Sequence, residues 1–359
     1  MSGAPDASVV LGVEPFKPPV FVFDNPNPGR RAGVDARVAD LKHRHVRADL
    51  EPLGDERLTA ARSRSLDVAG IPGVVSDVGE FYEVDINLVN PTLSADEWTL
   101  EFTGDVGSER TITYDELTAV DPEHRFVTLR CVGDRINGDL MDNALWTGVP
   151  MGEYLDSVQP QGEYVVLHAD DGYFEEFPLS ALERGFLAYG MNGEVLPEKH
   201  GYPVRALIPG HWGEINVKWI TEIEVVDEPI DGYWEKRGWH GTGPVNTVAK
   251  LRAVNHLDDG RIQVGGHAYA GVRGVREVEV SVDGGDSWES ATLSEPLKDA
   301  DVWRQWRYEW QPTADAHDVV VRAVDGTGTL QRDGTTEDER PFPDGAVGWV
   351  SETVEADPE

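Results

Sequence analysis

A single cysteine is the first residue in this sequence that could carry chemistry. Cys131 is the only cysteine among 359 residues, so it cannot form an internal disulfide. The apolar residues of 126–129 precede it and Gly133-Asp134 follows, which predicts a thiol at the end of a short buried strand. Loops at strand ends often present reactive groups, but most unpaired cysteines are small buried hydrophobic residues. The neighbours of Cys131 do not decide between these interpretations.

A glycine-rich, cationic segment is the second such feature. Residues 187–219 contain repeated Gly and Pro kinks together with His200, Arg205 and Lys218. Kinked backbone exposes N–H donors, and these three side chains can add positive charge, so the segment would suit a phosphorylated ligand rich in hydrogen-bonding groups. The alternative is that the three side chains pair with the many carboxylates of this chain.

Several common catalytic and cofactor motifs are missing from the sequence. There is no GxGxxG after a strand, no P-loop, no HExxH, no CxxC, no CxxCH and no GxSxG. One cysteine cannot hold an iron–sulfur cluster.

The charge is strongly acidic, with 66 Asp and Glu against 31 Lys and Arg and a net charge of −35. This excess argues against nucleic acid and anionic membranes as partners. It favours a protein that stays soluble at high salt, which predicts a halophilic, haloarchaeal source. No apolar stretch is long enough to span a bilayer. No apolar region follows Arg30-Arg31, so we expect a cytoplasmic protein without an export signal.

The pattern along the chain predicts three parts. Residues 1–75 lack periodicity and suggest an irregular arm, in which His43 and His45 are solvated rather than metal ligands. Residues 76–246 mix strands at 98–102, 126–132, 164–168 and 219–226 with short helices at 114–118 and 179–185, an α+β pattern.

Residues 247–359 are expected to form a β-sandwich. Val278, Val280 and Val282 alternate with polar residues before a hairpin turn at 283–285, and a further strand covers 319–324. Trp306, Tyr308 and Trp310 share one strand face. The acidic residues 352–359 are expected to fray.

Several motifs resemble the sulfite oxidase family of molybdenum enzymes, in the right order over residues 75–355. The resemblance is carried by residues 81–85, 128–131, 146–150, 192–193, 200–205, 217–219, 233–244, 278–285, 303–310 and 343–346. It implies an α+β fold, with a sulfite-oxidase-type molybdopterin-binding domain followed by an all-β, immunoglobulin-like dimerisation domain. It also implies a homodimer.

The resemblance implies a bound Mo-molybdopterin cofactor and a role for each matching residue. Cys131 would be the thiolate ligand of molybdenum, and a soft ligand is chemically suitable there. The residues that match cofactor contacts are Tyr82, Glu83, Asp171 (or its neighbour Asp170), His200, Arg205, Asn216, Val217 and Lys218.

The positions that would face a substrate depart from the family pattern. Asp85 and Ile136 stand where sulfite oxidases have arginines, although Arg135 is retained, and Trp239 stands at the position of their active-site tyrosine. Two cations and a phenol are thus replaced near the reacting centre, which disfavours the sulfite dianion as substrate.

The sequence therefore predicts two-electron oxygen-atom transfer with a small-molecule oxo donor or acceptor, in a sulfite oxidase-like enzyme of unassigned substrate. A sulfoxide or N-oxide reductase on the same scaffold is one alternative. A cofactor-free, immunoglobulin-like binding protein is another, and retention of Cys131, His200, Arg205 and Lys218 argues against it.

Overall fold

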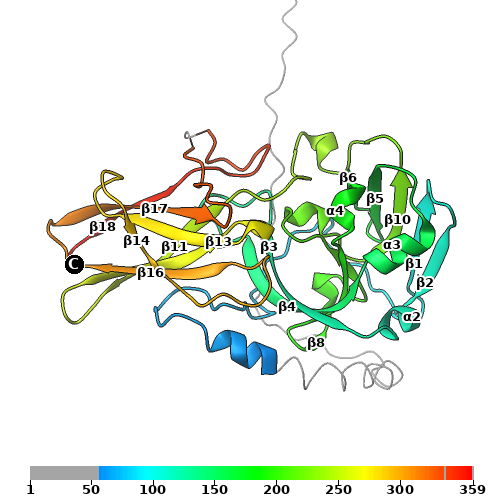
Figure 1. The fold of residues 1–359 in the computed structure, drawn as a ribbon, viewed down its shortest axis with the longest axis horizontal. Helices are drawn as coiled ribbons and strands as arrows, with labels where there is room; N and C mark the ends of the chain where they lie inside the picture. The colour runs from blue at the N-terminus through cyan, green and yellow to red at the C-terminus, as the bar shows by residue number, and fades with distance from the viewer. Residues whose placement is uncertain (1–55, 335–336, 358–359) are drawn as a thin grey trace, which may run out of the picture. The chain divides into compact units, whose positions relative to one another are not determined.

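The computed structural model describes residues 56–334 and 337–357 (Figure 1). His43, His45 and most of the expected N-terminal arm lie outside these residues. Within the described part of the arm, residues 56–62 are helical, and Leu58 and Ala61 of that helix are buried in a hydrophobic cluster with Val248 and Trp303.

The first sheet has the strand order β2-β1-β10-β5-β6 and lies between short helices. Its largest hydrophobic cluster unites strand residues such as Phe102 and Ile223 with helix residues such as Leu117 and Leu155. Thr113 caps the N-terminus of helix α2 (Tyr114–Thr118). Its hydroxyl accepts a hydrogen bond from the Glu116 amide, and Glu116 Oε2 accepts one from the Thr113 amide. The elements are β1 Thr99–Gly104, β2 Arg110–Thr113, α2 Tyr114–Thr118, α3 Gly152–Val158, β5 Tyr164–Ala169, β6 Phe174–Pro178, α4 Leu179–Leu182 and β10 Ile220–Val226.

The second sheet carries the strand that leads to Cys131. Its order is β3-β4-β7-β8, with β9 paired to β7. The bounds are β3 Glu123–Arg130, β4 Met141–Pro150, β7 Phe186–Met191, β8 Glu194–Val195 and β9 Arg205–Leu207. Turns of 3₁₀ helix at Glu198–His200 and Gly213–Ile215 flank β9. The sheet therefore brings the end of β3 and the start of β9 into one region of the molecule.

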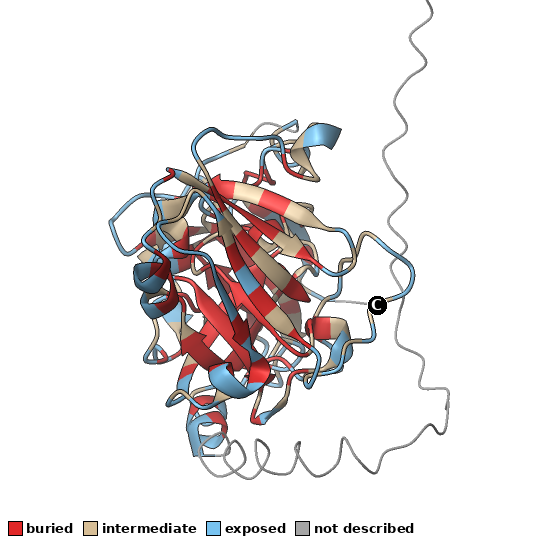
Figure 2. Cartoon of the chain, turned by 90° about the vertical axis from the view of Figure 1, so that its right-hand side faces the viewer, coloured by how far each residue is buried: buried red, intermediate tan, exposed pale blue. Residues whose placement is uncertain are grey.

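Two four-stranded sheets form the C-terminal sandwich, in the orders β11-β12-β16-β15 and β14-β13-β17-β18. One hydrophobic cluster joins them, with Val264 and Trp306 from one sheet and Val278 and Val321 from the other. Buried residues follow the strands and exposed residues gather in the connections (Figure 2). The bounds are β11 Val248–His256, β12 Ile262–Tyr269, β13 Val275–Ser281, β14 Glu289–Ser290, β15 Thr292–Leu293, β16 Arg304–Trp310, β17 Ala316–Asp325 and β18 Val350–Glu355.

The α+β class and the C-terminal sandwich agree with the sequence-based expectation, and two local predictions were wrong. The helix expected at 179–185 ends at Leu182. Residues 352–355 do not fray, because β18 pairs with β17 and buries Val350 and Val354. Within the part of the chain that the structure describes, no helix is long and apolar enough to cross a bilayer.

Candidate active site

Cys131 directly follows the last residue of β3 and is half-buried. Its amide donates to the Leu140 carbonyl at 3.0 Å, which closes a loop of residues 131–140. A Cβ placed on Gly213 would lie 2.8 Å from Oη of Tyr82 and 3.5 Å from Cα of Cys131. Any larger residue at position 213 would therefore crowd the region beside the cysteine.

The surroundings of Cys131 disfavour a free thiolate. Burial, with smaller contributions from the nearby carboxylates Asp134 and Glu214, raises the pKa of the thiol to about 12. Reactive cysteines normally have a lowered pKa, so catalysis by an unaided thiolate does not suit this position. A bound metal ion would supply the missing charge and deprotonate the sulfur.

Tyr82 lies close enough to Cys131 and Arg205 for both to affect its pKa. Its pKa is raised well above its ordinary value by burial and by Cys131, while Arg205 lowers it. The backbone amide of Tyr82 donates to Asp142 Oδ2 at 2.8 Å, and its ring stacks on Phe81 at a centroid distance of 5.5 Å. These contacts fix a neutral phenol beside the cysteine.

Arg205, at the start of β9, is buried with a side chain that is only partly satisfied. Its Nη atoms donate to the carbonyls of His200 and Asn216 at 3.2 and 2.9 Å, and the guanidinium lies over the Trp146 ring. Its Nε has no partner within the described residues, and no described carboxylate forms an ion pair with it. Burial lowers the pKa of Arg205 to about 10, so it remains charged at neutral pH. An anionic group would satisfy this donor.

His200 contributes no charge to the site. Burial, followed by the nearby Arg205, lowers its pKa to about 3. The neutral ring donates from Nε2 to the Val78 carbonyl at 3.2 Å, which leaves Nδ1 as an acceptor. His200 can therefore hold a neutral hydrogen-bond donor of a ligand but not attract an anion by charge.

Lys218 is neutralised within the protein. Its ammonium forms an ion pair with Asp85, and both side chains are largely buried. Asp171 lies in the same group, since burial and then Asp85 raise its pKa. Of the three side chains that the sequence offered to a phosphorylated ligand, Arg205 alone keeps an uncompensated charge in the described structure.

The other expected site residues divide into two groups. Asn216 and Val217 are buried beside Arg205, and the Asn216 side chain supports the local backbone by bonding Ile208 N and Trp212 O. Glu83 is exposed and pairs with Lys199 at 2.5 Å. Arg135 is also exposed, and its side chain has no hydrogen bond or ion pair within the described residues. The structure thus does not bring Glu83 or Arg135 into the buried site.

Trp239 is buried and packs edge-on against Phe342 at 5.1 Å. A Cβ on Gly133 would lie 3.6 Å from Sγ of Cys131 and 3.9 Å from the Trp239 ring, so the indole stands close to the thiol. This aromatic surface gives the region beside the cysteine an apolar wall.

Several buried carboxylates close to the Trp239 surface were not predicted from the sequence. Glu214 is buried, and burial and Glu235 raise its pKa to about 8. Burial and a hydrogen bond with Glu235 raise the pKa of Glu175 to about 10, and the Tyr173 hydroxyl donates to Glu175 at 3.0 Å. No sequence signal distinguishes these three glutamates in so acidic a chain. Because their pKa values are raised, Glu214 and Glu175 are protonated at neutral pH and add carboxyl groups without charge near Cys131.

These residues fit a molybdenum–pterin cofactor on three counts. Cys131 offers a soft ligand, Gly213 lets the Tyr82 hydroxyl pack close to the cysteine backbone, and Arg205 presents an unpartnered buried N–H. Within residues 56–334 and 337–357, no group of three or more His, Cys, Asp and Glu side chains is arranged to hold a metal ion. A metal bound at Cys131 would therefore take its other ligands from a cofactor.

Comparisons with known proteins agree with this architecture. Residues 87–234 match the oxidoreductase molybdopterin binding domain, and residues 244–337 match the Mo-co oxidoreductase dimerisation domain. The chain is 27% identical to mitochondrial sulfite oxidase of Macaca fascicularis over 68% of this chain and 55% of that protein. It is 23% identical to sulfite oxidase of Arabidopsis thaliana over 73% of this chain and 83% of that protein. It thus spans about half the length of the mitochondrial relatives.

A solved structure shares the fold. The sulfane dehydrogenase SoxCD of Paracoccus pantotrophus superposes with a TM-score of 0.68 at 19% identity, covering 80% of this chain and 82% of that chain. The two matched domains are those of molybdopterin-dependent oxidoreductases. Within that class, the chain belongs to the sulfite oxidase family.

Proposed function

We propose that this protein binds Mo-molybdopterin and catalyses two-electron oxygen-atom transfer. The observation that carries the proposal is the placement of Cys131, a half-buried single thiol at the end of β3, close to the neutral phenol of Tyr82, which only a glycine at position 213 allows to approach. When bound, the cofactor would supply a molybdenum centre able to exchange an oxygen atom and two electrons.

Each protein residue around the cofactor would have a separate role in binding or in excluding water. Cys131 would hold the metal, and Arg205 would bind an anionic part of the cofactor through its free N–H. Neutral His200 would accept a hydrogen bond at Nδ1, and the Asn216 carbonyl would keep the Arg205 guanidinium in place. Trp239 would exclude water from one side of the reacting region.

The lack of a free positive charge close to Cys131 in the described part of the chain favours a neutral substrate over sulfite. Lys218 is neutralised by Asp85, and Glu214, whose pKa is raised to about 8, is protonated at neutral pH and adds no charge. Arg135, the one arginine retained from the family pattern on this side, is exposed. We therefore propose a small sulfoxide, N-oxide or similar oxo donor or acceptor. The cofactor-free binding protein is less well supported, because it gives no use to Cys131 and the free donor of Arg205.

The partners follow from the same proposal. A second copy would bind through the C-terminal sandwich to form a homodimer, as the match to a dimerisation domain suggests. Since one cysteine cannot hold an iron–sulfur cluster, a separate electron carrier would deliver or remove the electrons.

Steady-state assays of the purified protein in both directions test the substrate. Sulfite oxidation converts sulfite and water to sulfate, two protons and two electrons, which ferricyanide can accept. Sulfoxide or N-oxide reduction takes two electrons from two equivalents of reduced viologen and two protons from water, and releases the sulfide or amine and one water molecule. We expect the kcat/KM for a neutral sulfoxide or N-oxide to exceed that for sulfite, with Cys131→Ser as the inactive control. A higher kcat/KM for sulfite would contradict the proposed substrate class.

A further inference from the structure

Three buried charged residues near Cys131 form what we call the Asp134 network. They are Arg130, Asp134 and Lys250. Asp134 Oδ2 accepts from Arg130 Nε at 2.9 Å and from Lys250 Nζ at 2.5 Å. All three side chains are fully shielded from solvent. The pair with Lys250 joins residues that are 116 positions apart in the sequence.

The Asp134 network holds both ends of residues 131–140, which we call the cysteine loop. The amide of Asp134 donates to the Cys131 carbonyl at 3.0 Å, and Asp134 Oδ1 accepts from the Leu140 amide at 3.1 Å. Lys250 Nζ also donates to the Gly138 carbonyl at 2.6 Å. One carboxylate and one ammonium therefore fix the loop that begins with the candidate metal ligand.

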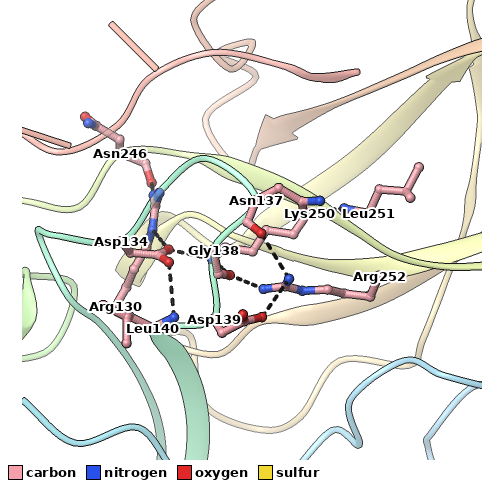
Figure 3. Close-up of polar contacts among 10 residues, drawn as sticks. All are labelled: Arg130, Asp134, Asn137, Gly138, Asp139, Leu140, Asn246, Lys250, Leu251 and Arg252. Carbon is pink, nitrogen blue, oxygen red and sulfur yellow. Dashed lines mark hydrogen bonds and ion pairs between the residues drawn. The ribbon is translucent and has the colours of Figure 1, made fainter. Parts of the chain in front are cut away.

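The loop is also attached to strand β11 of the C-terminal sandwich. Figure 3 shows Arg252 reaching the loop, where it donates to the carbonyls of Asn137 and Gly138 and pairs with Asp139 at 2.9 Å. The Leu251 amide donates to Asn137 Oδ1 at 3.1 Å. A Cβ on Gly138 would come within 2.7 Å of Asp134 Oδ1, so glycine is needed for the close approach.

The buried charges of the Asp134 network contribute little to the net free energy of folding by themselves. Removing an ion from water costs several kcal/mol, and apolar residues of similar volume are often as stable as a buried ion pair. Burial raises the pKa of Asp134, but Arg130 and Lys250 outweigh it and the net shift is downward. The carboxylate therefore stays charged and keeps both hydrogen-bond donors in one geometry, although burial lowers the pKa of Lys250 to about 7. A charged network with fixed partners selects one loop conformation.

We propose that Asp134 and Lys250 are positioning residues, which fix the cysteine loop and so the direction in which Cys131 presents its sulfur. The proposal rests on the proposed function, because it treats Cys131 as the ligand of a metal cofactor. It adds a structural link from the C-terminal sandwich, through β11, to that ligand.

Hydrogen exchange of the purified full chain tests the link without requiring activity. The variants are Asp134→Asn and Lys250→Met. We expect the amides of residues 131–140 to exchange about tenfold faster in both variants, while strands β5 and β10 exchange as in the wild type. Asp325→Asn is the matched control, because Asp325 is a buried carboxylate in the C-terminal sandwich that pairs with Arg273 and bonds nothing in the cysteine loop.

The Mo(V) electron paramagnetic resonance signal of the holoenzyme provides the second readout. We expect shifted g values in Asp134→Asn and Lys250→Met at unchanged molybdenum content, and a wild-type signal in Asp325→Asn. Unchanged loop exchange and unchanged g values would overturn the proposal. If Asp134→Asn does not fold, Lys250→Met decides, since it leaves the Arg130–Asp134 pair in place. Absence of molybdenum from the wild type would instead contradict the proposed function, while loop exchange would still test the positioning.

Discussion

The ammonium of Lys218 forms an ion pair with the carboxylate of Asp85, 133 residues away in the sequence. The resemblance to sulfite oxidases placed the lysine against the cofactor and the aspartate at a substrate-facing position. In the structure the two neutralise each other. Burial lowers the pKa of Lys218, while Asp85 opposes that shift and helps to keep the lysine charged.

Replacing Asp85 with asparagine should make the site more favourable for anions. The substitution removes one negative charge and leaves the Lys218 ammonium without its partner, so we expect the KM for sulfite to fall by about five- to tenfold. Glu83→Gln is the control, since it removes a carboxylate from the exposed pair with Lys199. Steady-state kinetics measure both, and an unchanged KM in Asp85→Asn would mean that this charge does not act on the substrate.

Replacing Arg205 with lysine should weaken retention of the cofactor. Lysine keeps a charge but cannot bond two carbonyls and present a further N–H in the fixed geometry of guanidinium. We expect the pterin content after gel filtration to fall to below about one third of the wild-type value. Arg304→Lys is the control, because Arg304 bonds the Ser294 carbonyl in the C-terminal sandwich. Equal pterin content in the two variants would contradict a cofactor role for Arg205.

The buried glutamates predict stability that decreases as the pH rises. Burial raises the pKa of Glu214 from 4.5 to about 8 and that of Glu175 to about 10. Between pH 4.5 and 8 the folded state holds protons that the unfolded chain has released, so the free energy of unfolding falls over this range. Glutamine at position 214 cannot titrate. The melting temperature of the Glu214→Gln variant should therefore fall less between pH 5.5 and 8.5 than that of the wild type.

Between pH 5.5 and 8.5, the fall in melting temperature should be about 3 °C or more smaller for Glu214→Gln than for the wild type. Glu101→Gln, at an exposed carboxylate on β1, should leave the wild-type pH dependence unchanged. Parallel melting curves for the wild type and Glu214→Gln across this pH range would show that burial of Glu214 does not affect stability.

The net charge of −35 predicts stability that rises with salt. At 1 M salt the screening length is about 3 Å, so repulsion among exposed carboxylates is largely removed. We expect the melting temperature to rise by about 10 °C between 0.1 and 2 M KCl. Sorbitol at matched osmolality separates charge screening from solute exclusion. A flat response to KCl would remove the support for a halophilic source.

Local patterns in the sequence predicted only part of the regular structure, namely β1, β3, β5, β10, β13, β16, β17, α2 and α4. The alternation of Val278 and Val280 with polar residues correctly indicated a strand, which the structure places in β13. Strand β18 lacks this regular alternation, since it buries only Val350 and Val354 and has the exposed Glu352 at the position between them. Its acidic residues therefore concealed the strand.

The charge state of the site could not be predicted in the same way. The sequence shows which residues can carry charge, but His200 is neutral because of burial, and Lys218 is compensated by a residue from a distant loop. The sequence around Lys250 gives no indication of its role, because its partner Asp134 lies in the molybdopterin-binding domain, whereas Lys250 lies in the dimerisation domain. Long-range pairing depends on the assembled fold, which residue types and spacing do not specify.

Metal and pterin analysis of the purified chain tests the central claim most directly. We predict about one molybdenum and one pterin per chain in the wild type, and no turnover in Cys131→Ser with the circular dichroism spectrum preserved. A wild-type protein without molybdenum when produced in a host that makes the cofactor, or an active Cys131→Ser variant, would contradict the account.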